Sequence, residues 1–463
     1  MSASSRDALL ANSDVHEKAI QKYITDHPNC DTKMVINAFQ FDKISPAKVY
    51  ELPRNLLHLN PENGRFKAEL DVIREERKRD GKPLDLNPED DDDVKTIRDM
   101  IRGIHPNNAE RASAFKKLYD NIYEVAQKTA TNGQEIPGLI THDGILVNGN
   151  RRDTVMEDLA ETTKKQKGEP LKYHYIRVGI LDKGVSRYDL WKNEAKEQIS
   201  QESREEYDYV NSALEIKRGY ELLTQKGLSP KKATDEIAKT LYGRSAKDVE
   251  DYIDFLKIAD LFLKQIGKKD QYRYIQESGG GAGEKGIVTI LQEVAKQRTK
   301  YDKEGWDAIT LQKWFKTVSL FCVFSKIKPT VVSGGKKRKL SFGHREFRIF
   351  QRKAMATEDT RKRVFEAPVL SNVDMQKPTP EHALEFYQAI DRAQGYYDVQ
   401  EDITNPLLLL ERARDSLSKI SQDLNGTYKS QMIKLIKDNK GEQFISDIKR
   451  MIADITKKIS NRT

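Results

Sequence analysis

The sequence predicts an α+β protein in which a small mixed α/β domain precedes a mostly helical region. Short apolar runs bounded by Gly, Pro and Asn, the pattern of strands, are concentrated in the first 185 residues. From residue 186 onward, apolar residues recur almost everywhere at helical spacing. Because 463 residues are too many for one ordinary core, we expect two or three domains.

Composition indicates a soluble, cytoplasmic protein without a membrane partner. There is no run of about 18 apolar residues, and the N-terminus lacks the apolar centre of a signal peptide. Two cysteines, Cys30 and Cys322, cannot build a disulfide framework or a structural zinc site by themselves, and the eight histidines show no metal-ligand spacing. We therefore expect no metal site made by the protein alone. The net charge of +8, from 80 basic and 72 acidic residues, does not establish nucleic-acid binding.

The chain is expected to divide into four segments. Residues 1–45 read as a polar helical extension, and 46–185 as the α/β domain with a helical insertion over 66–134. Residues 186–278 read as a helical domain. A glycine-rich linker at 279–283 precedes a mostly helical C-terminal domain, 284–463, to which we assign no role.

Within the α/β domain, a first strand near Val49 runs into a turn rich in Asn, Pro and Gly that ends at Arg65. The acidic run 89–93 fits either a loop or the first turn of the helix after it. The remaining elements are strands over 136–141, 145–147 and 173–181, a tight turn at Asp143-Gly144 and a helix over 153–165.

The segment Asn148-Gly149-Asn150-Arg151-Arg152 connects a predicted strand to that helix. A helix N-terminus offers unpaired N–H groups and partial positive charge, and glycine lets the backbone approach a ligand. Two adjacent arginines add charge-assisted contacts to phosphate oxygens. The segment therefore predicts a phosphate site. The alternative is a surface turn with solvated arginines.

A second stretch strengthens this prediction through a family resemblance. Leu56 with Asn60-Pro61-Glu62-Asn63-Gly64-Arg65, and Gly149-Asn150-Arg151-Arg152, resemble the two boxes of the ParB/sulfiredoxin superfamily, specifically ParB-like partition proteins. The resemblance implies that both boxes fold around a nucleoside triphosphate, CTP or ATP, with Mg²⁺. The nucleotide-binding residues so implied are Arg65, Gly149, Asn150, Arg151, Arg152 and, from a third polar motif, Glu194.

The chain departs from the family pattern in three places. Gly64 replaces the usual proline of the first box, and the boxes lie about 85 residues apart, farther than is typical. Asn150 occupies the position of the sulfiredoxin cysteine, which excludes sulfiredoxin chemistry. The third motif matches neither Asn193-Glu194 nor Glu197-Gln198 cleanly, and an ordinary solvated helix face is its alternative.

Glu62 is the candidate catalytic residue. It is the acid closest to the expected phosphates in the first box, where a carboxylate can hold magnesium or activate a nucleophile. A turn carboxylate without catalytic role is the competing interpretation. Slow triphosphate hydrolysis is therefore left open.

Residues 228–256 resemble the helix-turn-helix of partition proteins. Ser229-Pro230 starts one helix, 231–241, and Ser245 caps a second that runs to about Leu256. The expected DNA contacts are Arg244, Ser245 and Lys247. The second helix also carries four carboxylates, which repel a phosphate backbone: Asp248, Glu250, Asp251 and Asp254. DNA reading and protein contact are both consistent with this helix.

A second basic stretch, 333–353, is the stronger electrostatic candidate for DNA. Its expected contacts are Lys336, Lys337, Arg338 and Lys339. The phenylalanines among its charges suit unstacked bases, and they equally suit a core beneath a lysine-rich hairpin; they are Phe342, Phe347 and Phe350.

The preferred function is a nucleotide-gated, DNA-associated switch or clamp that acts as a homodimer or with a partner protein. The alternatives are a nuclease or phosphotransferase on the same fold, or a non-catalytic scaffold. The amphipathic segment 444–459 fits either a dimerisation helix or a core-packing helix.

Overall fold

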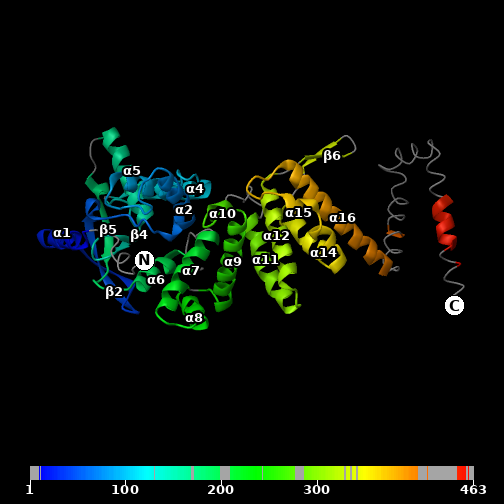
Figure 1. Cartoon of the computed structure of the whole chain (residues 1–463). Helices are drawn as coiled ribbons and strands as arrows, with labels where there is room; N and C mark the ends of the chain where they lie inside the picture. Colours follow the sequence, from blue (N-terminus) through cyan, green and yellow to red (C-terminus); the bar gives the residue numbers. More distant parts are fainter. Residues whose placement is uncertain are drawn as a thin grey trace. The chain divides into compact units, whose positions relative to one another are not determined.

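Figure 1 shows the computed structural model of the chain. The chain divides into two compact units. The first comprises residues 1–347 and 372–384, and the second comprises 348–371 and 385–463. The residues that the structure describes are 10, 12–129, 131–167, 171–198, 209–241, 243–276, 286–327, 330–333, 336–339, 342–404, 414–415, 446–454 and 457. The expected linker at 279–283 and part of the 444–459 segment lie outside them.

A five-stranded mixed sheet forms the N-terminal part of the first unit, followed by helices, so the predicted α+β class is confirmed. The strand order is β1-β2-β5-β3-β4; β3 pairs with β5 in parallel and the other neighbours are antiparallel. The strands are β1 (Asp31–Gln40), β2 (Lys43–Pro53), β3 (Gly138–Ile140), β4 (Leu146–Asn148) and β5 (Tyr175–Ile180).

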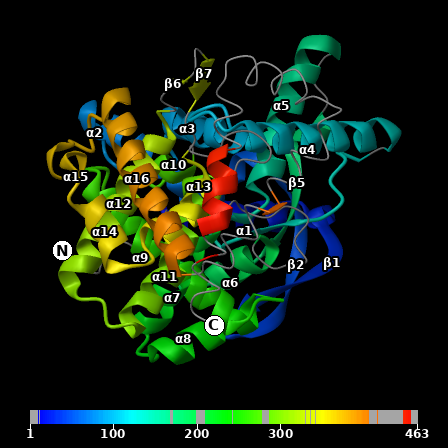
Figure 2. The ribbon, with the colours of Figure 1, turned by 90° about the vertical axis from the view of Figure 1, so that its right-hand side faces the viewer.

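The prediction that residues 1–45 form a helical extension is wrong beyond the first helix. Among the described residues of this range, α1 (Ser13–Asp26) is followed by a 3-10 turn at Pro28–Cys30 and then by β1, which pairs with β2 as the edge of the sheet, the long blue ribbon of Figure 2. Ala38 and Ala47 are buried on one face of this hairpin, whereas Val35 on the other face is exposed. That alternation is the strand signal. The turn between the strands uses left-handed backbone at Phe41 and Asp42.

Helices cover both faces of the sheet. Ile140 and Leu146 contribute to a large core with the helices around them, whereas their neighbours Leu139 and Val147 face a smaller cluster beside α6 (Arg187–Gln198). The helices of this main core are α1, α2 (Lys67–Arg79), α3 (Asp91–Arg102), α4 (Ala109–Lys128) and α5 (Asn150–Lys167).

The acidic run belongs to a helix N-terminus, which decides between the two interpretations of it. The Asp90 side chain accepts a hydrogen bond from the Asp93 backbone N–H, and α3 begins at Asp91. Carboxylates in a first helical turn are favourable because they face the positive end of the helix dipole.

The remaining described part of the first unit is helical except for one hairpin. Its elements after α6 are α7 (Tyr209–Gln225), α8 (Pro230–Thr240), α9 (Ala246–Gln265), α10 (Arg273–Gln276), α11 (Ile287–Lys303), α12 (Ala308–Ser325), β6 (Thr330–Ser333) and β7 (Lys336–Lys339). Helix α13 (His344–Ile349) crosses the boundary between the units.

The described part of the second unit is helical. It contains a π-helix over Phe350–Ala354, α14 (Glu358–Phe365) and most of α15 (Pro368–Asn372) and α16 (Pro380–Thr404). Lys353 Nζ lies 2.7 Å from an Asp398 carboxylate oxygen, tying the π-helix to α16. Within the described residues of the whole chain, none of the helices combines the length and apolar character needed to cross a bilayer.

Candidate functional site

The turn predicted to bind phosphate, residues 148–152, has a left-handed glycine directly after β4. Gly149 has φ of +98°, and a Cβ there would lie 3.3 Å from the Gly138 backbone, so a side chain at this position would be strained. The Asp153 backbone N–H donates to the Gly149 carbonyl at 2.9 Å. Helix α5 therefore begins at Asn150, earlier than the predicted start at Asp153. Asn150, Arg151 and Arg152 belong to its first turn and not to a loop.

A buried asparagine joins the two sequence boxes despite their separation along the chain. The Asn60 backbone N–H donates to Asn150 Oδ1 at 2.8 Å, and Asn150 Nδ2 donates to the Leu146 carbonyl at 3.0 Å. Both asparagines are at most 7% exposed. The Asn150 side chain thus holds the first box against the start of α5, and leaves its backbone as the part that can face a ligand.

The first box is a pair of asparagine-stabilised turns. Asn60 Oδ1 accepts from the Glu62 backbone N–H at 2.9 Å, and Asn63 Oδ1 accepts from the Arg65 N–H at 3.0 Å. Such side-chain acceptors fix a local turn in the absence of a regular ladder. The Arg65 carbonyl in turn accepts from Arg111 at 2.7 Å, which anchors the box to α4.

Glu194 and Arg218 connect the first box to the helical region. Glu194 is 3% exposed, and its Oε1 accepts from the Gly64 N–H at 2.8 Å. Arg218, on α7, lies 3.6 Å from Glu194, 3.7 Å from Glu62 and 3.3 Å from Glu215. Sequence reasoning missed Arg218, whose only signal was its position in the helix that precedes the helix-turn-helix.

Glu62 and Asn193, the two other polar residues predicted at the site, differ in what they contact. The Glu62 side chain is 52% exposed beside Arg218, so it is open to solvent and to a ligand. Asn193, the other half of the third motif, instead bonds the Phe39 backbone through both its amide atoms, at 2.7 and 2.8 Å, and secures the edge strand.

A buried ion pair fixes the start of α5. Arg54 donates to both carboxylate oxygens of Asp153, at 2.7 and 3.2 Å, and to Glu157 at 2.6 Å. The Arg54 and Asp153 side chains are 7% and 6% exposed. Burial alone would lower the pKa of Arg54, but the two carboxylates raise it above its usual range. Because Arg54 neutralises Asp153, the first turn of α5 keeps its attraction for anions.

Both arginines of the second box are half-buried, and the Arg152 guanidinium donates to the Ile136 carbonyl. Beside them, the buried Asn148 Oδ1 accepts no hydrogen bond from the described residues. An unsatisfied buried acceptor is unfavourable, and a hydroxyl or amino group of a ligand would satisfy it.

No group of three or more His, Cys, Asp or Glu suited to a metal ion occurs in the described part of the chain. Magnesium bound with a nucleotide needs only one or two carboxylates together with phosphate oxygens and water. Glu62 can supply one such carboxylate.

Helices α8 and α9 occupy the predicted helix-turn-helix segment and pack against each other, with α9 extending to Gln265 and not ending near Leu256. Its start is occupied by local pairs. Ser245 and Asp248 form a capping box, and Lys247 Nζ lies 2.7 Å from Asp251, which raises the Lys247 pKa. The Arg244 guanidinium lies 5.9 Å from the Tyr252 ring centroid. The three expected DNA contacts therefore lie close together in sequence at the start of α9, and each has a local partner: Tyr252 for Arg244, Asp248 for Ser245 and Asp251 for Lys247.

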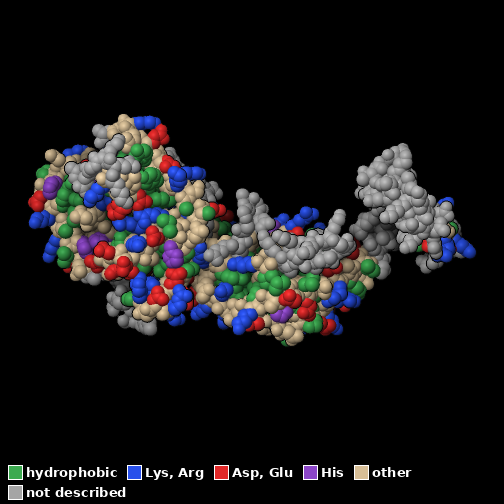
Figure 3. All heavy atoms as spheres, turned by 90° about the horizontal axis from the view of Figure 1, so that it is seen from above, with side chains coloured by type: hydrophobic (Ala, Val, Ile, Leu, Met, Phe, Trp, Pro, Cys, Tyr) green, Lys and Arg blue, Asp and Glu red, His purple; other side chains and the backbone are tan. Residues whose placement is uncertain are grey.

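The second basic stretch contains the β6–β7 hairpin, followed by three buried phenylalanines. Strand β7 pairs with β6 in register Thr330↔Lys339, and the side chains of Lys336, Lys337, Arg338 and Lys339 lie outside the described part. The idea that its phenylalanines contact bases is wrong, because all three are buried: Phe342, Phe347 and Phe350. Phe342, for example, packs edge-on against Phe321. On the face in Figure 3, acidic and basic side chains are interspersed over the described residues.

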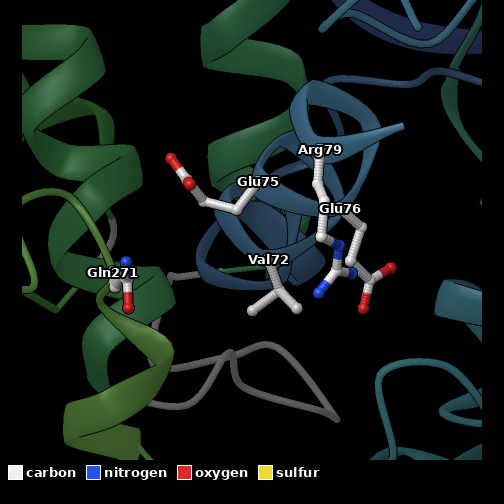
Figure 4. Close-up of a pocket in the computed structure, with 5 residues that line it drawn as sticks. All are labelled: Val72, Glu75, Glu76, Arg79 and Gln271. Carbon is white, nitrogen blue, oxygen red and sulfur yellow. The ribbon is translucent and has the colours of Figure 1, made fainter. Parts of the chain in front are cut away.

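A surface pocket lies elsewhere in the first unit. Val72, Glu75, Glu76 and Arg79 extend from α2, and Gln271 lies across from them (Figure 4). It contains none of the residues of the phosphate turn or the first box, and its two carboxylates disfavour a phosphate ligand.

Comparison with known proteins does not assign a family. No protein-family model, no curated protein and no solved structure matches the chain.

Proposed function

We propose that the chain binds a nucleoside triphosphate, CTP or ATP, at the start of α5 and acts as a nucleotide-gated, DNA-associated switch or clamp. The observation that carries the proposal is the buried hydrogen bond from Asn60 to Asn150. It joins the two boxes whose resemblance to ParB-like proteins implies a shared nucleotide site. We place the protein in the cytoplasm, working as a homodimer or with a partner protein.

The residues around the turn suit phosphate binding. The N–H groups at the start of α5 and the guanidinium groups of Arg151 and Arg152 would bind the phosphates, with Gly149 permitting close approach. Arg65 would add charge from the first box. The Asn148 amide oxygen would accept from a ribose hydroxyl or a base amino group. Mg²⁺, when bound, would offset part of the phosphate charge.

Gating would pass through Arg218. This arginine reaches from α7 to Glu62 and Glu194 beside the first box. A triphosphate at the first box would attract the Arg218 guanidinium, and Mg²⁺ would attract the Glu62 carboxylate. Either would weaken the ion pairs that hold α7 against the box. Because α7 packs against α8 and α9, a shift of α7 would reach the helix-turn-helix.

For DNA, we expect the β6–β7 hairpin to contribute more than α9. Replacing Lys336, Lys337, Arg338 and Lys339 by alanine should reduce the slope of log affinity against log salt by about 3 to 4, because each phosphate contact contributes about 0.9. Binding to duplex DNA over a range of salt concentrations measures the slope.

The matched comparison is R244A/K247A in α9. Since Lys247 is already paired with Asp251, this double variant should change the slope by less than about 1. An unchanged slope in the hairpin variant would refute its role in DNA binding.

An enzyme on the same fold is the alternative, and Glu62 tests it. If Glu62 activates a nucleophile, Glu62→Gln should lower CTP or ATP hydrolysis about 100-fold while leaving nucleotide binding in place. Turnover of the exposed control Glu110→Gln should match the wild type. A Glu62→Gln protein that hydrolyses both nucleotides at the wild-type rate removes the catalytic role.

A further inference from the structure

Two histidines connect α1 to the sheet domain through a chain of hydrogen bonds. His16 Nδ1, on α1, lies 3.2 Å from Nε2 of His58, and the rings meet edge-on with centroids 4.4 Å apart. At one end, His16 Nε2 lies 2.7 Å from a Glu89 carboxylate oxygen. At the other end, His58 Nδ1 lies 3.3 Å from the Pro88 carbonyl oxygen. The order is carboxylate, ring, ring, carbonyl.

This order determines how many N–H protons the two histidine rings need to make all three hydrogen bonds. Both ends, Glu89 and Pro88, present acceptors, so the outer nitrogen of each ring must carry a proton. The contact between the rings needs one proton more, which makes three. Two neutral imidazoles carry two protons, so one contact lacks its hydrogen. Two imidazolium ions carry four, so His16 Nδ1–H and His58 Nε2–H repel each other.

We propose that His16 and His58 hold one shared excess proton and form a two-sided pH latch that fastens α1 to the sheet domain. The latch is closed when the pair is singly protonated. It weakens when the pair loses that proton and again when it gains another. The device is independent of the proposed nucleotide function, although His58 lies only two positions before Asn60.

The surroundings favour a single positive charge. The charged groups facing the pair are Glu89, from the segment between α2 and α3, and Asp143, from the β3–β4 turn. Both are acidic and oppose the loss of the shared proton. The Asp143 carboxylate also accepts from Ser13 Oγ at 2.6 Å, a second attachment of α1 to the same turn.

The second protonation occurs only at acid pH. Burial lowers the pKa of His58, and the charge on His16 lowers it further, against the opposing effects of Pro88 and Glu89. A histidine whose folded pKa is depressed binds fewer protons folded than unfolded. The attachment of α1 is therefore lost as pH falls through the window below the ordinary histidine pKa of about 6.5.

Other contacts keep α1 in place when the latch weakens. Ile20 is fully buried in the main core, and Lys183 pairs with Asp14 at 3.2 Å and Glu17 at 2.7 Å. We therefore expect loosening of α1, measured as faster amide exchange, and not its complete release.

Hydrogen exchange of the α1 backbone across pH 5 to 8.5 tests the proposal on the wild-type chain. After correction for intrinsic exchange chemistry, protection should pass through a maximum and fall about fivefold on each side, the equivalent of one hydrogen bond. The imidazole ¹⁵N signals should show two titration steps separated by more than about one pH unit. Protection that is flat or monotonic, or two independent steps at the same pH, overturns the proposal.

Variants separate the latch from general effects of pH. His16→Gln and His58→Gln should each remove the maximum of α1 protection. The double variant should have no larger effect, because either substitution already breaks the row of hydrogen bonds from Glu89 to Pro88. His27→Gln is the control, since His27 stacks on Tyr23 near the end of the same helix and takes no part in the chain. A maximum that persists in the double variant also overturns the proposal.

Discussion

Replacing Arg54 by methionine should lower the free energy of unfolding of the first unit by about 3 to 5 kcal/mol, because it leaves a buried carboxylate without its partner. The Asp153 side chain is 6% exposed, and both of its carboxylate oxygens accept hydrogen bonds from Arg54. Urea unfolding followed by tryptophan fluorescence measures the effect. All three tryptophans lie in the first unit: Trp191, Trp306 and Trp314.

Two comparisons isolate the cause. In R54M/D153N the uncompensated charge is gone, so at least half of the lost stability should return. Lys116→Met removes a surface ion pair with Asp120, whose side chains are 75% and 58% exposed, and should cost less than about 1 kcal/mol. If Arg54→Met costs no more than Lys116→Met, the pair does not hold the start of α5.

The double variant R151A/R152A should weaken CTP or ATP binding at least about 100-fold, since each guanidinium would lose a charge-assisted contact of about 1.5 to 3 kcal/mol. Both arginines lie in the first turn of α5, where the helix N-terminus would also face the phosphates. Isothermal titration calorimetry of the folded variant measures the loss.

The control is K116A/K117A, which also removes two positive charges, here from the exposed face of α4. It should bind nucleotide like the wild type at physiological salt, because distant surface charges are screened. Equal weakening in both variants would show that net charge, and not the turn, governs binding.

Local signals in the sequence were sufficient for the strand-turn-helix around Gly149. Gly149 follows a short apolar strand and precedes an amphipathic helix, and the structure has β4 and α5 there. β1 was missed because Asp31, Thr32 and Lys33 begin it and only Ile36 and Ala38 mark its inner face. A polar edge strand carries a weak hydrophobic pattern, and pairing with β2 stabilises it through contacts that the pattern does not contain.

The contacts that hold the site join residues far apart in sequence. Arg54 bonds to Asp153 and Asn60 to Asn150, and neither partner can be chosen from sequence spacing. The burial of Phe342 is likewise set by Phe321 on another helix. Sequence composition identified the chemical types present at the turn, whereas tertiary packing decided which of them face one another.

The most direct test is calorimetric titration of the wild-type chain with CTP and with ATP, in Mg²⁺, with and without duplex DNA. We expect saturable binding of at least one nucleotide at one site per chain, lost in R151A/R152A and retained in K116A/K117A. The absence of binding by either nucleotide up to about 1 mM would contradict the proposed site, because that concentration corresponds to only about 4 kcal/mol of binding free energy.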